Sequence, residues 1–391
     1  MNGKKIGLFL GALLFIIMLL LPVPDGMKPE AWSVAAVTAL MAVWWITEAI
    51  PIPATALLPI LLYPALGVLK PSQATTAYAN EVVYLFIGGF FLAVAMEHWN
   101  LHRRIALQTV RIVGTSPSHM VLGFMIAVAF LSMWISNTAC AVMMVPIGIA
   151  VISQITGLSI KDIHNGKPEN KKSTNFAKAL MIGVAYAASI GGVATLIGTP
   201  PNSIMKGMVL NLYKIDIAFV QWLMFGLPFA VIMLAVAWLL LTKVLFRMGD
   251  LKLAGSRDVI DREIEKLGPM SRAEISVAII GILMALMWIS RGFIKTDFFK
   301  AYISDTTIAI SGAMLLFLVP VDFKKGIHIL EWKTAVKIPW DIVLLFGGGF
   351  AIANGFQSTQ LALWLSSKLT QLNALHTIIF VLIVALLVTF L

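Results

Sequence analysis

The sequence is poor in the residues on which secreted domains and soluble metalloenzymes depend. Its 391 residues include one cysteine and six histidines, and only 12% of them are charged. One cysteine excludes a disulfide framework within the chain and a site of several thiolates. The histidines show no metal-binding spacing, and a soluble domain carries about twice this share of charge. These absences exclude a disulfide-stabilised domain, a cysteine or histidine metal centre and an ordinary soluble fold.

Long apolar segments take the place of the missing charge. A helix needs about 20 residues to cross the hydrocarbon of a bilayer. Spans are predicted at residues 6–22, 31–48, 52–69, 82–99, 179–212 (interrupted), 220–246, 274–290, 305–321 and 340–356. The basic start of residues 1–21 also fits a signal peptide, but no small-residue cleavage site follows, which favours a retained helix. The sequence therefore predicts an all-α, polytopic membrane protein.

The net charge of +10 has an uneven distribution. Basic residues gather in three polar loops, at 156–178, 247–273 and 322–338. Such clustering is typical of cytoplasmic loops, so it needs no nucleic-acid partner, and it places the N-terminus inside the cell. The three loops share one side only if 119–152 enters the membrane and returns. The charge pattern thus predicts a re-entrant hairpin there.

An internal repeat relates two apolar segments at an offset of 260 residues. Residues 81–93 and 341–353 share seven of 13 positions, and 119–131 and 379–391 share five of 13 at the same offset. By the predicted topology, the two copies cross the membrane in opposite directions. Inverted repeats with broken helices are common in secondary transporters, and their sites lie at the repeat interface.

The offset also places the counterpart of Ser132 at position 392, beyond the last residue. The repeat therefore predicts a sequence that ends inside its second copy, with on the order of 100 residues missing. The predicted domains are N-terminal scaffold helices (1–80), a first repeat (81–246), a connector with further scaffold helices (247–338) and the start of a second repeat (339–391).

Two polar segments interrupt the apolar pattern. The first, residues 132–138, reads SMWISNT, and the second, 191–202, reads GGVATLIGTPPN. Glycine and proline break a helix. A break frees carbonyls that can bind a cation, and it creates a helix N-terminus that attracts anions. The alternative is structural, because Ser and Thr often join membrane helices and Gly and Pro often only kink them.

Other polar positions favour structural roles. Glu48 lies at a helix end, and Glu81 and Asp341 lie at matching helix starts, where the helix dipole stabilises a carboxylate. Residues 101–113 are predicted to form an amphipathic helix at the membrane surface.

Three motifs in this order resemble the divalent anion:sodium symporters, often called the INDY family. They are WWITEAIPIPATALLP at 44–59, SNT at 136–138 and GTPPN at 198–202. The resemblance covers nearly the whole chain. It implies a homodimer in which a transport domain moves against a scaffold as an elevator.

The resemblance also implies roles for single residues. A first sodium site would use Ser132, Ser136, Asn137 and Gly198. Asn137, with Thr138, Thr199 and Pro200, would contact the substrate. The family's second set of motifs has no counterpart within these 391 residues. The resemblance further implies that sodium is the coupling ion, with no other cofactor, and that the protein lies in the plasma membrane of a bacterium.

We therefore predict a carrier, not an enzyme, that imports C4-dicarboxylates such as succinate, malate or fumarate with sodium. Alternatives are a citrate or sulfate symporter on the same fold, a dicarboxylate exchanger without sodium coupling and, more distantly, an intramembrane enzyme. An enzyme would need a nucleophile with its base, or metal ligands, at membrane depth, and the sequence shows no such group.

Overall fold

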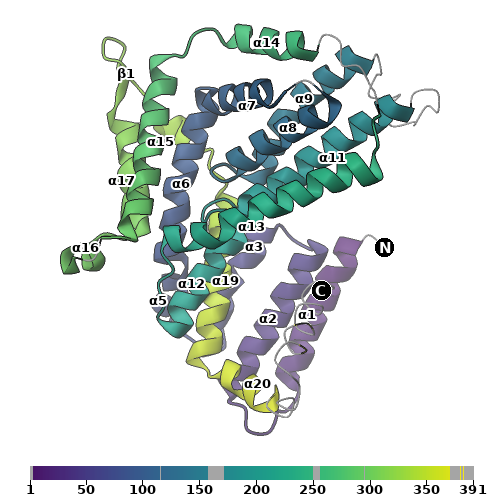
Figure 1. The fold of residues 1–391 in the computed structure, drawn as a ribbon. Coiled ribbons are helices and arrows are strands. Elements are labelled where there is room, and N and C mark those ends of the chain that lie inside the picture. Colours follow the sequence, from purple (N-terminus) through teal and green to yellow (C-terminus); the bar gives the residue numbers. More distant parts are fainter. Residues whose placement is uncertain are drawn as a thin grey trace. The chain divides into compact units, whose positions relative to one another are not determined.

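The computed structural model describes residues 3–114, 116–156, 171–249, 256–294 and 296–369, and the single residues 379 and 382. The chain forms two compact units, residues 1–80 with 341–391, and residues 81–340. Helices dominate both (Figure 1). Among the described residues, seven helices are long and apolar enough to cross a membrane, or eight with one bent pair. The all-α, polytopic prediction is confirmed, whereas the repeat segment 379–391 falls outside the described residues except for residues 379 and 382.

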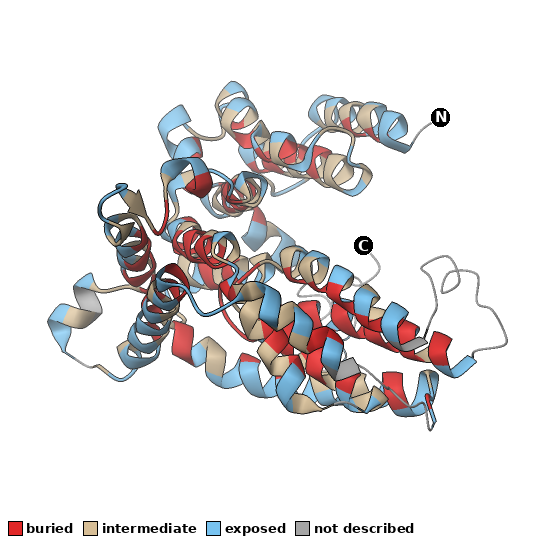
Figure 2. Ribbon diagram, turned by 90° about the horizontal axis from the view of Figure 1, so that it is seen from above, coloured by how far each residue is buried: buried red, intermediate tan, exposed pale blue. Residues whose placement is uncertain are grey.

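The first unit contains helices from both ends of the chain. Its elements are α1 (Gly3–Leu20), α2 (Pro29–Thr47), α3 (Ile52–Ala56), α4 (Leu58–Ala65), α5 (Pro71–Thr76), the 3-10 turn η1 (Ala77–Ala79), α19 (Trp340–Ser358) and α20 (Leu361–Leu369). Helix α1 packs on α2 through two glycines, Gly7 and Gly11, its only buried residues. The rest of α1, next to the N label in Figure 2, is exposed or half-buried. Such an apolar outer face suits lipid.

The prediction of one continuous span at 52–69 is wrong. Two short helices, α3 and α4, replace it and meet at Leu57. Pro59 has no N–H to donate to the carbonyl of Thr55, so the first helix cannot continue. Glu48 lies where α2 ends, in the left-handed region (φ 45°), and pairs with Lys4 at 3.0 Å.

The second unit carries the remaining elements. They are α6 (Glu81–His98), α7 (Leu101–Val113), α8 (Pro117–Ser132), α9 (Asn137–Thr156), α11 (Lys171–Val193), α12 (Pro200–Tyr213), α13 (Phe219–Leu239) with a π-helical extension (Leu240–Leu245), α14 (Ser256–Leu267), α15 (Arg272–Arg291), α16 (Asp297–Tyr302), α17 (Asp305–Leu318) and α18 (Trp332–Ala335). Strands β1 (Pro320–Asp322) and β2 (Ile327–His328) form an antiparallel hairpin.

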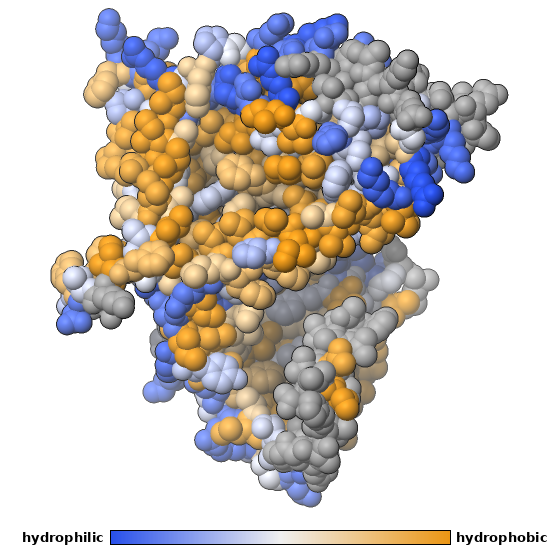
Figure 3. Space-filling model, in the orientation of Figure 1, coloured by the Kyte–Doolittle hydropathy of each residue, from blue (hydrophilic) through white to orange (hydrophobic). Residues whose placement is uncertain are grey.

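Two helix groups make the core of this unit. Helix α11 packs against α8, α9 and α13, and α17 packs against α6 and α15. Polar contacts hold α7 to α15 and α14. Arg104 of α7 bonds Glu274 of α15 at 2.7 Å, and Arg111 of α7 pairs with Asp261 of α14 at 3.0 Å. The helix predicted at 101–113 is therefore present as α7. In Figure 3, orange apolar side chains cover the outer faces of α15 and α13, and blue ones lie near α14.

The repeat of 260 residues extends to the backbone. Helices α6 and α19 end at His98 and Ser358, and in both copies the next helix begins three residues later. The residue before that helix has a positive φ in both, 59° at Asn100 and 64° at Gln360. This shared helix–turn–helix geometry supports the predicted repeat.

Repeated glycines make repeated close contacts. A Cβ added to Gly88 would lie 2.7 Å from the backbone of Ala309 on α17. A Cβ added to its counterpart Gly348 would lie 2.7 Å from the carbonyl oxygen of Ala56 on α3. Each copy therefore uses the same glycine to bring its helix against a neighbour.

Candidate functional site

The first polar segment forms the turn between α8 and α9. Helix α8 ends at Ser132, and α9 begins at Asn137. The Ser136 hydroxyl accepts the Ala139 N–H at 3.3 Å, which caps the start of α9. Both α8 and α9 pack on α11. We call residues 132–138 the tip.

The second polar segment is a complete interruption between α11 and α12. Helix α11 ends at Val193, and α12 begins at Pro200. The buried Asn202 amide donates back across the gap to the carbonyls of Gly192 (2.9 Å) and Thr195 (2.7 Å). Asn202 thereby satisfies carbonyls that the missing helical turn leaves without partners. We call residues 194–199 the break.

The tip lies directly against the break and the end of α11. The Ser132 hydroxyl is within hydrogen-bond distance of the Asn137 Oδ1 atom (2.6 Å) and of the Ala188 carbonyl (2.7 Å). The Thr195 hydroxyl donates to the Met133 carbonyl at 2.6 Å. Ser132 and Thr195 are fully buried, at 0% exposure. Two segments that are 60 residues apart in the sequence thus form one polar centre.

Two glycines make room for this centre. A Cβ on Gly192 would lie 2.6 Å from Asn137 Oδ1. A Cβ on Gly198 would lie 2.5 Å from the Gly192 carbonyl oxygen and 3.0 Å from that of Ser132. Because real Cβ atoms do not approach oxygen so closely, only glycine at these two positions allows the chain to come so near to these oxygens.

The predicted site residues divide into three groups. Ser132, Asn137 and Gly198 meet in the polar centre. Ser136 caps α9, as described above. Three others, Thr138, Thr199 and Pro200, lie at helix starts beside the centre: Thr138 is exposed on α9, and Thr199 precedes α12 without a side-chain capping bond. Because Pro200 lacks an N–H, α12 offers fewer donors to an anion than most helix N-termini.

Sequence reasoning assigned no role to Asn202, Thr195 or Trp134. Asn202 and Thr195 lie in the second polar segment, so their polar side chains could have been recognised as candidates from the sequence. The carbonyls that they bond could not be identified without the fold. Trp134 lies in the tip, where an aromatic side chain is ordinarily read as packing.

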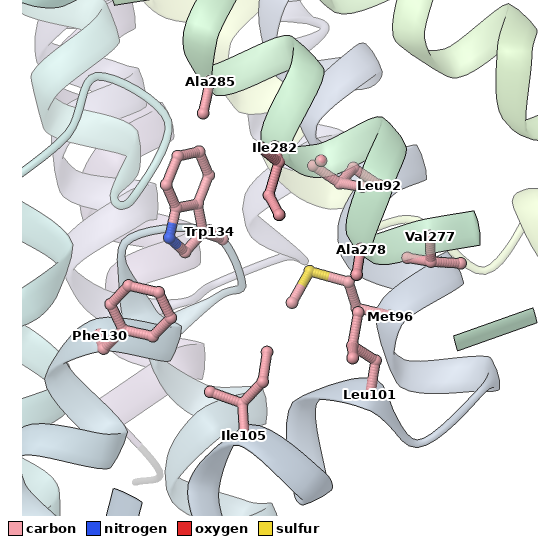
Figure 4. Close-up of a pocket in the computed structure, with 11 residues that line it drawn as sticks. Leu92, Met96, Leu101, Ile105, Phe130, Trp134, Val277, Ala278, Ile282 and Ala285 are labelled. Carbon is pink, nitrogen blue, oxygen red and sulfur yellow. The ribbon is translucent and has the colours of Figure 1, made fainter. Parts of the chain in front are cut away.

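A cavity of about 310 Å³ lies beside the tip (Figure 4). Trp134 and Phe130 form one wall, and apolar side chains of α6, α7 and α15 form the others. No hydroxyl, amide or carboxylate side chain lines this space. It is therefore unsuited to a dicarboxylate and is separate from the polar centre.

A second cavity, of about 370 Å³, borders the tip at Ile135. It is also lined by Glu97, Asn100 and His102 and by residues of α9. Burial lowers the pKa of His102, and Arg103 lowers it further, although a hydrogen bond to the Met96 carbonyl (2.9 Å) acts in the opposite direction. His102 is accordingly neutral at pH 7 and contributes no fixed positive charge near the tip.

The polar centre can bind a small cation of low charge. Its groups are hydroxyl, amide and carbonyl oxygens, the ligands that hold Na⁺ at helix breaks in transporters. Neither the tip nor the break contains a charged residue. Among the described residues, no group of three or more His, Cys, Asp or Glu could hold a metal ion. This set of neutral oxygens fits the ligands that sodium prefers.

Replacing Thr195 by valine tests the bond between break and tip. Valine has nearly the same shape but leaves the Met133 carbonyl buried without its partner. We expect a loss of about 1–3 kcal/mol in unfolding free energy, measured as a lower thermal midpoint in detergent. Thr242→Val is the control, since this buried hydroxyl bonds a carbonyl of its own helical segment, that of Trp238. Equal losses in both variants would contradict a special role for Thr195.

Comparison with known proteins decides the family. The model of the sodium:sulfate symporter transmembrane region matches residues 3–391. The chain belongs to this family. The resemblance to divalent anion:sodium symporters is thereby confirmed, and the polar centre can be considered as part of a transporter.

Two similar proteins agree with this assignment. The chain is 41% identical over 391 residues to the sodium-dependent dicarboxylate transporter SdcS of Staphylococcus saprophyticus. The matched region covers 100% of this chain and 74% of that protein. It is 42% identical over 385 residues to SdcS of Staphylococcus aureus (strain USA300), and the match covers 97% of this chain and 72% of that protein. The similarity includes the tip and the break.

Proposed function

We propose that this family member is a secondary carrier that moves C4-dicarboxylates into the cell together with sodium. The observation that carries the proposal is the meeting of tip and break in one buried centre of neutral oxygens. Such a centre offers sodium several ligands, but it offers an anion no fixed cation. Bound sodium would therefore supply the positive charge that holds the dicarboxylate.

This arrangement links substrate affinity to sodium occupancy. Sodium would be held by Ser132, Ser136, Asn137 and Gly198. The dicarboxylate would lie against Asn137, Thr138, Thr199 and Pro200, beside the N-termini of α9 and α12. Helix N-termini favour negative charge because their first N–H groups are unpaired. The names of the two staphylococcal relatives, both sodium-dependent dicarboxylate transporters, support this choice of ion and substrate.

The wider setting follows from the same proposal. The chain is a multi-pass membrane protein, and we place it in the plasma membrane with its N-terminus in the cytoplasm. We further propose a homodimer with scaffold helices at 1–80 and 247–338 and moving repeats at 81–246 and 339–391. The tip and its helices, 119–152, would form a re-entrant hairpin, because α8 has only 16 residues.

Uptake of labelled succinate into proteoliposomes tests the proposal. An inward sodium gradient should raise uptake by roughly 5–150-fold over a potassium gradient, the range expected for a coupling free energy of about 1–3 kcal/mol. Equal uptake in both salts would instead indicate an exchanger without sodium coupling.

Sulfate and citrate are the competing substrates on this fold. The description of the family names sulfate, so labelled sulfate belongs in the same assay. Sodium-dependent uptake of sulfate or citrate without uptake of succinate would reject the dicarboxylate but keep sodium symport.

A further inference from the structure

Four charged side chains meet in the second unit, from the middle of α12, the segment that follows it, the end of α15 and the start of α17. Lys206 of α12 bonds Asp305 of α17 at 2.6 Å and approaches Asp216 at 3.2 Å. Arg291, the last residue of α15, bonds Asp305 at 3.0 Å and Asp216 at 2.9 Å. Lys206 is 5% exposed and Asp305 is 1% exposed. We call these four residues the ion cluster.

The ion cluster is balanced, with two cations and two carboxylates. Buried charges are tolerated only when they are paired, so each member depends on the others. Burial alone would raise the pKa of Asp216, but Lys206 and Arg291 lower it below its ordinary value. Asp216 therefore stays ionised at neutral pH.

Asp305 also connects to an aromatic stack. Its carboxylate accepts the Phe219 N–H at 3.0 Å, and its carbonyl accepts the Trp288 indole N–H at 2.9 Å. The rings of Phe219 and Trp288 stack with centroids 4.8 Å apart. Trp134 of the tip stacks on both, each at 6.4 Å. One wall of the apolar cavity is therefore part of this stack (Figure 4).

Both halves of the polar centre thus lead to the same residue, Asp305. The tip reaches Asp305 through Trp134 and the stack. The break reaches it through α12, whose Lys206 lies about two turns after Thr199. A site for a small cation needs its ligands held within about 0.5 Å by a second layer of contacts. Asp305 is placed to provide that layer for both segments.

We propose that Asp305 is the positioning residue of the sodium site and that it holds the tip through Trp134 and the break through Lys206. This inference rests on the proposed function, because it assigns a role in sodium binding. It goes further by naming residues that contact neither ion nor substrate. The competing view is that the ion cluster only stabilises the fold.

Asp305→Asn, studied in the whole protein, separates these views. The sodium concentration that half-saturates succinate uptake should rise about tenfold, because the site becomes looser. Uptake at saturating sodium should stay within about twofold of the wild type, since the ligands themselves remain. Sodium titration of the thermal midpoint in detergent should show the same shift without transport, because ligand binding stabilises the folded state.

Two further variants test the two connections to Asp305. In Asp305→Asn the ion cluster keeps two cations but only one carboxylate, Asp216. Adding Lys206→Met removes the excess buried cation, so thermal stability should recover while sodium affinity stays low. Trp134→Leu leaves the ion cluster and the Phe219–Trp288 pair intact but removes the ring of the tip from the stack, and it should raise the half-saturating sodium concentration several-fold. Recovery of sodium affinity in the double variant would overturn the proposal and favour a purely structural ion cluster.

Glu274→Gln is the matched control. It breaks another buried ion pair of the same unit, that with Arg104, which contacts neither tip nor break. Unchanged sodium half-saturation in this control, with a shift in Asp305→Asn, supports the proposal. Equal half-saturating sodium concentrations in Asp305→Asn and wild type would overturn this inference but not the proposed function. A wild type that responds to sodium in neither assay would overturn the proposed function and this inference together.

Discussion

Replacing Asn137 by alanine is expected to lower sodium-dependent succinate uptake by about 100-fold at limiting sodium. The Asn137 Oδ1 atom lies 2.6 Å from the Ser132 hydroxyl and packs closely against Gly192. Alanine removes an amide oxygen from the proposed cation site and takes a partner from the buried Ser132 hydroxyl. Together these losses amount to about 3 kcal/mol, or roughly 100-fold in affinity.

Asn175→Ala provides the comparison for this variant. Asn175 lies near the start of α11, and its amide donates to the Arg247 carbonyl at 2.9 Å, far along the helix from the break. We expect uptake close to wild type in this control. Uptake that survives in Asn137→Ala with an unchanged dependence on sodium would remove the tip from the sodium site. Size-exclusion profiles of the purified variants establish that both are folded.

Gly198→Ala is expected to abolish sodium-dependent uptake while leaving the protein folded. The added Cβ would lie 2.5 Å from the Gly192 carbonyl oxygen and 3.0 Å from that of Ser132. These are backbone atoms, so the break and the tip must move apart. A displacement approaching 1 Å costs about 100-fold at a positioned site, and overpacking alone costs about 1–3 kcal/mol in stability.

Gly349→Ala is the control for added bulk. This glycine lies in α19, and a Cβ there meets no atom within 4 Å. Its uptake should match the wild type. Retained uptake and unchanged sodium dependence in Gly198→Ala would show that this space is not part of the sodium site. If Gly198→Ala no longer yields a monodisperse protein, a general packing defect explains its loss of uptake. Gly192→Ala then replaces it in the same uptake assay, because its added Cβ would meet the Asn137 side chain and not backbone.

Sequence patterns predicted the helices well because their signals are local. The apolar segment 82–99 and the amphipathic segment 101–113 appear as α6 and α7. Hydrophobic length and periodicity determine such elements within a single stretch of chain. The interruption at 191–202 was equally readable, because glycine and proline limit the backbone wherever they stand.

The predictions failed or were silent where contacts are distant. The division of 52–69 into α3 and α4 is an exception, because Pro59, which causes it, is a local signal. The β1–β2 hairpin and α18, which carry no strong local signal, lie where the end of the predicted span 305–321 and the predicted loop 322–338 were expected. The roles proposed for Ser132, Asn137 and Gly198 remain predictions, although the structure brings these three residues together.

The sequence by itself determined that this is a membrane protein of the family its motifs resemble, with two helix breaks and a repeat of 260 residues. Composition, apolar length and motif spacing are properties of the chain, so they need no fold. Only the tertiary structure decided that the tip meets the break, that Asn202 bonds the carbonyls of the break, and that Asp305 joins both segments. Lys206 and Asp305 lie 99 residues apart, and Trp134 and Trp288 are further apart still. Such pairs form because buried charges and aromatic rings find partners across packed helices, and packing has no signature in the local sequence.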